Sequence, residues 1–183
     1  MTIPTFIHTY KKRVVEAKLV KFYSTINNAI SLAEIEHGAA GTWNISDDFL
    51  WFEEILGPYI KVSEYKFTDD GKLDYVLFLD GSKLLFDGKI DWLYYPIGNT
   101  SGHKNGKDRF LFEFYPDNTS PWGEYLKGKK LAPYLFSWDG SRETLMSNCD
   151  GSVVSSGIGK GAYCTALIWQ NNWKIPDDYP YKF

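Results

Sequence analysis

The sequence lacks long apolar runs and strong charge of one sign. No stretch of roughly eighteen consecutive apolar residues occurs, which is about the length that a membrane-spanning helix needs. The opening residues MTIPTF also lack the basic and apolar regions of a signal peptide. The formal net charge is only −3, so composition gives no reason to expect a nucleic-acid partner. We therefore expect the chain as given to be soluble and not to bind nucleic acid.

Familiar catalytic and cofactor-binding motifs are also missing. There is no G-x-S-x-G nucleophile elbow, and the glycine-rich stretches 98–106 and 151–161 fit neither a P-loop nor a strand–helix phosphate site. The three histidines, His8, His37 and His103, have no spacing typical of metal ligands. The sequence therefore predicts neither an enzyme nor a bound cofactor.

Carboxylate-rich segments give a weak indication of calcium binding. Residues 69–74 (DDGKLD) supply oxygen ligands around a glycine, but they lack the alternating spacing and the distant glutamate of a calcium loop. This segment is more typical of a hairpin turn. Near the C-terminus, Asp150, Asp177 and Asp178, together with Asp139, are the weak calcium candidates.

The composition favours one folded domain. A hydrophobic content of 44% over 183 residues suffices for one well-buried core, so we expect a single domain over 1–183. The aromatic content of 17% is high and only slightly greater in the second half than in the first, and aromatic residues are typical of a sheet. Tryptophans in the second half have two possible uses, packing in the interior and stacking on sugars or bases, and packing is the default. They are Trp122, Trp138, Trp169 and Trp173.

One long helix is expected at the N-terminus. Residues 5–38 carry apolar side chains at a 3.6-residue period, with Pro4 at the start and Gly38 just past the end. At 1.5 Å per residue the helix would be about 50 Å long, which is more than a domain of this size needs. Its apolar stripe comprises Phe6, Tyr10, Val14, Ala17, Leu19, Phe22, Ile26, Ile30 and Ala33.

The first part of this helix is strongly basic. Residues 1–21 carry a net charge of +4, which leaves −7 for the rest of the chain. The charges have two interpretations, a solvated helix face or a basic collar beside a membrane surface or an acidic neighbouring subunit. The cations are Lys11, Lys12, Arg13, Lys18 and Lys21, opposed by Glu16 alone.

The remainder indicates an antiparallel sheet followed by loops. Residues 39–58 predict a connecting loop with one short helix over 49–56, capped by Ser46. Residues 59–115 contain strand-like segments joined by turns such as Asp80-Gly81, which predicts an antiparallel sheet of about four strands. Residues 116–183 are turn-rich and predict a C-terminal loop region. The fold class is therefore α+β.

The two cysteines suggest a constraint on that C-terminal region. Cys149 and Cys164 enclose fourteen residues rich in glycine and serine, and their spacing is not that of a C-x-x-C redox or zinc motif. They are either two unrelated buried thiols or a disulfide, and the disulfide is favoured. It would contribute about 3 kcal/mol by the loop-entropy argument, pin the loop onto the sheet, and imply an oxidising compartment.

Three segments together resemble a known family. The helix IPTFIHTYKKRVVEAKLVKFYSTINNAISLAEIE, in which Pro4 matches a helix-interrupting proline, resembles bacterial type IV pilins and type II secretion pseudopilins just after their membrane-spanning half. The segment CTALIWQNNWKIPDDYP at 164–180 resembles the closing segment of a pilin-like subgroup. Residues 106–110 (GKDRF) resemble a G-x-D-x-F element of the same subgroup.

The resemblance implies a filament subunit. It implies a long helix packed on an antiparallel sheet with a disulfide-bounded C-terminal loop, in a homo-oligomeric helical filament. Residues 26–33 would pack on the sheet while residues 6–14 project toward neighbouring subunits, and the head would face outward toward a surface ligand that is not identified. The assembly surface implied comprises Phe6, Tyr10, Val14 and Ala17, with Lys11, Lys12 and Arg13.

The resemblance also implies an anchor. Family members begin with a short basic leader and about 20 apolar residues, which are long enough to cross a membrane. Neither is present, so we expect Met1 to replace them and the chain to be a soluble truncation. The natural form would be anchored in the inner membrane of a Gram-negative bacterium before it joins an extracellular pilus or a periplasmic pseudopilus. The family's cleavage site and acidic assembly residue have no counterpart here.

Two other functions stay open. The chain could be a pseudopilin of a type II secretion system, which the sequence hardly separates from a surface pilin. It could also be a carbohydrate- or protein-binding module that uses tryptophans such as Trp122 and Trp138. An enzyme is the least favoured of the alternatives.

Overall fold

The structure is a computed structural model. It describes residues 3–88, 90–102, 104–117, 126, 128–136, 138–153 and 159–183, with side chains from residue 7 onward. Helix α1 (Ile3–His37) leads into the short helices η1 (Ala40–Thr42), η2 (Phe52–Leu56) and η3 (Gly57–Tyr59). The strands are β1 (Val62–Phe67), β2 (Leu73–Phe78), β3 (Lys83–Asp87), β4 (Asp91–Tyr95), β5 (Phe110–Phe114) and β6 (Leu131–Pro133), followed by α3 (Arg142–Asp150) and α4 (Cys164–Gln170).

Helix α1 confirms the long helix that the periodicity predicted. It spans 35 residues and ends where Gly38 adopts a φ of +81° and donates its N–H to the carbonyl of Glu34. Only glycine adopts that left-handed conformation without a steric penalty, so it closes the helix. The side chains buried against the sheet are Val15, Leu19, Phe22, Ile26, Ala29, Ile30 and Ala33, whereas Ala17, expected in the apolar stripe, is exposed.

The sheet is a six-stranded antiparallel meander in the order β1 to β6, and the expected strand count of about four was wrong. The unexpected strand, β6, pairs with β5 and lies in the region predicted to be loop. It is only three residues long and ends at Pro133, so it has too few alternating positions to be recognised. Its proline is tolerated because β6 lies at the edge of the sheet.

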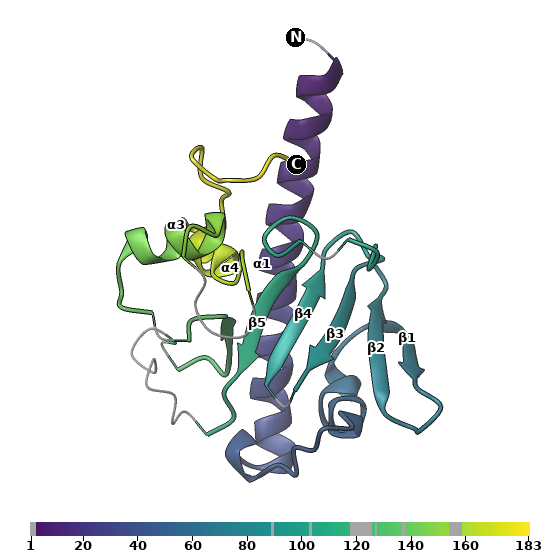
Figure 1. Cartoon of the computed structure of the whole chain (residues 1–183). Coiled ribbons are helices and arrows are strands. Elements are labelled where there is room, and N and C mark those ends of the chain that lie inside the picture. Colours follow the sequence, from purple (N-terminus) through teal and green to yellow (C-terminus); the bar gives the residue numbers. More distant parts are fainter. Residues whose placement is uncertain are drawn as a thin grey trace.

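Strands β4 and β5 are buried on both faces. In β4, Trp92 and Tyr94 pack with α1, whereas Leu93 and Tyr95 pack with the C-terminal helices. Side chains alternate between the faces of a strand, so this sheet separates two hydrophobic clusters. Figure 1 shows α1 running behind the sheet while α3 and α4 lie beside β5. Burial on both faces explains the continuous apolar run in β5, which otherwise breaks the alternation expected of an antiparallel strand.

Turns and caps differ from the prediction in detail. The Asp80-Gly81 hairpin is confirmed, but four residues, 79–82, connect β2 to β3 rather than two. The short helical segment before β1 is also present, but η2 begins at Phe52 and no side chain caps it, so the expected cap at Ser46 was wrong. Asp48, not Ser46, accepts a hydrogen bond from the backbone N–H of Leu50, at 3.1 Å. Ser46 instead donates its hydroxyl to Asp48, which orients that carboxylate.

The C-terminal region contains two helices where only loops were predicted. Ser141 caps α3 by accepting the N–H of Thr144 at 3.1 Å, and Gly151 closes it with a φ of +80°. Helix α4 is seven residues long, and its first five residues are all buried. Both helices are too short to show a helical period, and their burial in the second cluster stabilises them.

Candidate functional site

The first turns of α1 extend beyond the sheet. Figure 1 shows the N-terminal end of the helix standing clear of the strands. Burial against the sheet begins only at Val15, while Ile7 is 47% and Tyr10 is 63% exposed. We call residues 7–14 the projecting segment. Within it, Val14 is half-buried, and the side chain of Phe6, another expected assembly residue, lies outside the described residues.

The basic collar divides into two parts. The ammonium group of Lys18 donates to the carbonyls of Asp80 and Pro96, at 2.8 Å each, and Lys21 pairs with the Asp80 carboxylate at 2.9 Å. These two lysines therefore attach α1 to the loops of the sheet. The carboxyl of Asp80 has its pKa lowered to about 2, because hydrogen bonds from Ser82 and Lys21 outweigh the opposing effect of burial.

The other cations lie on the projecting segment. Lys11 and Arg13 are exposed and form no ion pair with any residue that the structure describes. Lys12 is half-buried, and its ammonium group lies 3.8 Å from the carboxylate of Asp177. A groove of about 450 Å³ runs between this segment and the loop after β4, lined by Tyr10, Lys11, Val14, Val15, Ile97, Asn99, Gly102, Lys107, Asp108 and Phe183.

The C-terminal tail holds α1 where the projecting segment meets the packed part of the helix. Glu16 is only 6% exposed, and its carboxylate accepts the backbone N–H of Ile175 at 2.9 Å and the ammonium group of Lys174 at 3.2 Å. About two turns further along α1, the ring centroid of Tyr23 lies 4.9 Å from that of Trp173. The single acid of the basic collar therefore joins the two ends of the chain.

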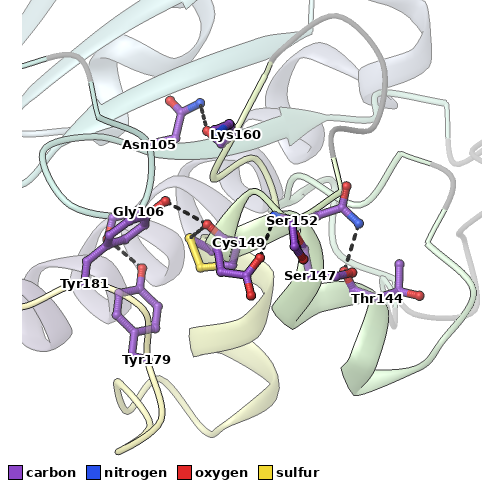
Figure 2. The surroundings of a disulfide bond; sticks show 12 residues. Asn105, Gly106, Thr144, Ser147, Cys149, Ser152, Lys160, Tyr179 and Tyr181 are labelled. Atoms are coloured by element: carbon purple, nitrogen blue, oxygen red, sulfur yellow. Dashed lines mark hydrogen bonds between the residues drawn. A yellow bond between two sulfur atoms is a disulfide. The ribbon is translucent and has the colours of Figure 1, made fainter.

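A disulfide between Cys149 and Cys164 confirms the favoured interpretation of the two cysteines. It links the end of α3 to the first residue of α4, so it joins two helices rather than pinning a loop to the sheet. Both cysteines are fully buried, with a Cα–Cα distance of 4.6 Å. Figure 2 shows Tyr181 beside the bond, where its hydroxyl donates to the carbonyl of Cys149 at 2.8 Å.

The G-x-D-x-F element packs against this disulfide. Gly106 has a φ of +76°, and a Cβ there would lie 2.3 Å from the sulfur of Cys164, so only glycine fits. Its carbonyl accepts the hydroxyl of Tyr179 at 2.6 Å, as seen in Figure 2. Asp108 accepts the backbone N–H of Lys104 at 3.2 Å, which closes the turn. The element therefore joins the sheet, the disulfide and the C-terminal tail.

The calcium candidates do not gather. Both carboxylate oxygens of Asp178 accept hydrogen bonds from one guanidinium nitrogen of Arg142, at 2.8 and 2.9 Å. Asp150 accepts the backbone N–H of Ser152 at 2.7 Å. The third candidate, Asp177, lies near Lys12, as described above. No group of three metal-ligating acids, histidines or cysteines occurs among the described residues. Residues 68–72 form the turn between β1 and β2, and Leu73 and Asp74 are the first residues of β2.

Of the four tryptophans singled out for stacking, the three that the structure describes are used in packing. Trp138 is 4% exposed and donates its indole N–H to the carbonyl of Ser141 at 2.7 Å. Trp173 stacks on Phe112, and Trp169 packs against the second cluster. Trp122 lies outside the described residues, as does His103. The other two histidines are exposed at opposite ends of α1.

A buried and a half-buried carboxyl group escaped sequence analysis. Glu113 on β5 is 2% exposed and lies directly opposite Asp91 on β4. Burial raises the pKa of Glu113 to about 7, assisted by the charge of Asp91 and opposed by the hydroxyl of Tyr115. Burial and the nearby Asp87 raise the pKa of Asp91 to about 6. The only signal in the sequence was a glutamate inside the apolar run RFLFEFY.

Sequence comparison places the chain in a family. Residues 5–183 match the model of a family of unknown function, DUF6613, and the chain belongs to that family. Neither the curated proteins nor the solved structures include a significant match. In the described part of the chain, no helix has the length and the apolar character needed to cross a bilayer.

Proposed function

We propose that this protein is a structural subunit of a filament of the type IV pilus kind, which self-assembles through α1. The observation that carries the proposal is the projecting segment, where a continuous helix leaves its sheet and exposes Ile7 and Tyr10. A helix that served only the core of this domain would gain little from these turns, because the side chains of Ile7 and Tyr10 stay largely in water. Burial between neighbouring subunits would remove that surface from water.

The rest of the fold supports the same function. The contacts of Lys18 and Lys21, the tilted ring contact between Trp173 and Tyr23 and the tail contact at Glu16 fasten the packed half of α1 to the head. Because α1 is held rigidly on the head, contacts between the helices of neighbouring subunits would also fix the orientation of their heads. The disulfide and the buried sheet make the head a compact unit that would face outward, and the disulfide favours an oxidising compartment. We propose that the filament lies outside the cytoplasm and that the subunit is anchored at the inner membrane before assembly.

Assembly in cells tests this proposal. The complete gene is expressed in its native host, and filaments are sought by immunogold electron microscopy. Replacing Ile7 and Tyr10 by Asp should abolish the filaments, because each charge would enter an apolar subunit contact. Replacing Leu79, which is 67% exposed on the β2–β3 connection, by Asp is the matched control and should leave them intact. Absence of any filament from wild-type cells, or normal assembly of the Ile7 and Tyr10 variants, would refute the proposal.

A pseudopilin of a type II secretion system would use the same surfaces, so the cell experiment includes a secretion measurement. Long surface filaments with normal protein secretion indicate a pilus. Loss of secreted proteins from the medium when the gene is deleted, without surface filaments, indicates a pseudopilus.

A further inference from the structure

The two ends of α1 carry opposite charge. Residues 3–15 contain three cations and no acid, whereas residues 34–54 contain six acids and neither lysine nor arginine. The acids include Glu34 in the last turn of α1, where the helix dipole favours cations, and no acid occupies the first turn. The charge on α1 is thus opposite to the distribution that would stabilise an isolated helix. A contact between the charged ends of α1 and other surfaces would give a physical reason for this charge distribution.

The acidic end also exposes apolar side chains. On α1, Leu32 is 49% and Ile35 is 84% exposed, and Leu50 before η2 is 36% exposed. Helices η2 and η3 pack on α1 at this end, where the hydroxyl of Tyr59 donates to the carboxylate of Glu36. Six residues form one surface here, which we call the acidic end. They are Leu32, Ile35, Glu36, Leu50, Glu53 and Glu54.

Two of its carboxylates lack a counter-ion. Glu53 and Glu54 are exposed and form no ion pair with the described residues. By contrast, the carboxylate of Glu34 lies 3.9 Å from the ammonium group of Lys130 in the same molecule. The acidic end therefore combines exposed apolar side chains with uncompensated negative charge. The projecting segment has the matching combination, with Ile7 and Tyr10 beside Lys11 and Arg13.

We propose that the projecting segment of one copy docks on the acidic end of a second copy, head to tail. This inference rests on the proposed filament function and specifies which two surfaces meet. From Tyr10 to Glu34 the helix rises by about 36 Å, so the two surfaces cannot meet within one molecule. Because the two surfaces differ, each copy keeps one of them free after docking, and repetition of the contact gives an open chain. Opposite charges steer the encounter and fix its direction.

A charge-swap experiment on the 183-residue chain tests the contact. One variant carries Lys11→Glu and Arg13→Glu, and the other carries Glu53→Lys and Glu54→Lys. Self-association is measured by sedimentation velocity over a concentration series at low ionic strength, because salt screens exposed charges. Each variant alone should associate about tenfold more weakly than wild type, since like charges would then face each other. Mixing the two should restore association, because both new contacts again pair opposite charges.

Matched controls carry reversed charges elsewhere on the head. Lys61→Glu with Lys66→Glu, and Asp69→Lys with Asp74→Lys, change exposed residues around β1 and should associate as wild type does. Lack of concentration-dependent association by wild type would overturn the proposal, as would failure of the mixture to recover. Binding of wild type to anionic phospholipid vesicles that is lost with Lys11→Glu and Arg13→Glu, while self-association is unchanged, would assign the cations to a membrane surface instead.

The same variants separate this contact from the filament function. In cells, filaments that depend on Ile7 and Tyr10 but tolerate both charge reversals would leave the filament function standing and refute the head-to-tail contact. Filaments that are lost with either reversed variant and regained when both are co-expressed would support both proposals.

Discussion

The buried glutamate on β5 predicts that the folded protein becomes less stable as the pH rises from 5 to 8. Glu113 is 2% exposed and faces Asp91 across the β4–β5 pair, while its carboxylate accepts the hydroxyl of Tyr115 and, at 3.3 Å, the backbone N–H of Leu135. Burial moves its pKa from an ordinary 4.5 to about 7. The folded protein therefore holds this proton more tightly than the unfolded chain does.

The sign and the size of the effect follow from this difference in pKa. Unfolding releases the proton between about pH 4.5 and pH 7, so the stabilisation is complete below pH 4.5 and is lost as the pH rises through 7. A change of this size corresponds to roughly 3 kcal/mol of unfolding free energy. Carboxyls whose pKa is lowered, such as Asp80, act in the opposite sense, but only below about pH 4, outside this window.

Urea denaturation followed by tryptophan fluorescence at pH 5, 6, 7 and 8 measures the effect. Over this range Glu113 should lower the unfolding free energy of wild type by roughly 2 to 3 kcal/mol, and Asp91, whose pKa is also raised, adds to the fall. Glu113→Gln removes this titration but leaves that of Asp91, whose pKa is also raised, so its unfolding free energy should still fall as the pH rises, but by less than that of wild type. At pH 8 it should equal or exceed the stability of wild type. Glu64→Gln, an exposed strand glutamate, is the control and should keep the wild-type slope. A wild-type stability that is flat or rises from pH 5 to pH 8 would refute the reasoning.

Two further predictions concern stability. Full reduction of the Cys149–Cys164 disulfide should lower the melting temperature by roughly 6 to 12 °C, because a loop of this length contributes about 3 kcal/mol. Calorimetry with and without a phosphine reductant measures this, the Cys149→Ser, Cys164→Ser double variant should not respond, and an unchanged wild-type melting temperature would contradict it. Asn27→Ala should cost about 2 to 4 kcal/mol in urea denaturation, because the N–H and carbonyl of Leu131 would lose the Asn27 amide that bonds them, at 3.2 and 3.0 Å. Asn28→Ala, at an exposed position, is its control, and equal effects of the two changes would show that the Leu131 contact contributes nothing.

Local patterns in the sequence were sufficient for α1 and most of the sheet. The helix has 35 residues over which an apolar period can repeat, and Gly38 provides a stop signal that depends only on backbone conformation. The hairpins were recognisable because a turn such as Asp80-Gly81 encodes its own geometry. The cysteine pair was predicted for a similar reason, since a glycine- and serine-rich loop without a core needs a covalent constraint. Each of these signals lies within a short stretch of chain.

The candidate site was only partly predictable. The sequence placed five cations near the start of α1, but it could not show that Lys18 and Lys21 bind the loops of the sheet while Lys11 and Arg13 do not pair. That difference depends on which face of the helix meets the β2–β3 connection. The acidic end was not recognised either, because its residues come from α1 and η2, which meet only after the chain turns back.

The sequence by itself determined the elements whose signals are local: one long helix, the hairpins of the sheet and the cysteine-bounded segment. Tertiary structure alone decided what distant residues do to one another. Asn27 and Asn28 are the same residue type on the same helix, yet Asn27 completes the edge of β6, 104 positions away, while Asn28 lies in water. Likewise Glu113 has a raised pKa only because the packed sheet excludes water from it and the charge of Asp91 lies opposite it. Burial and pairing depend on packing across the fold, which no local pattern of residues encodes.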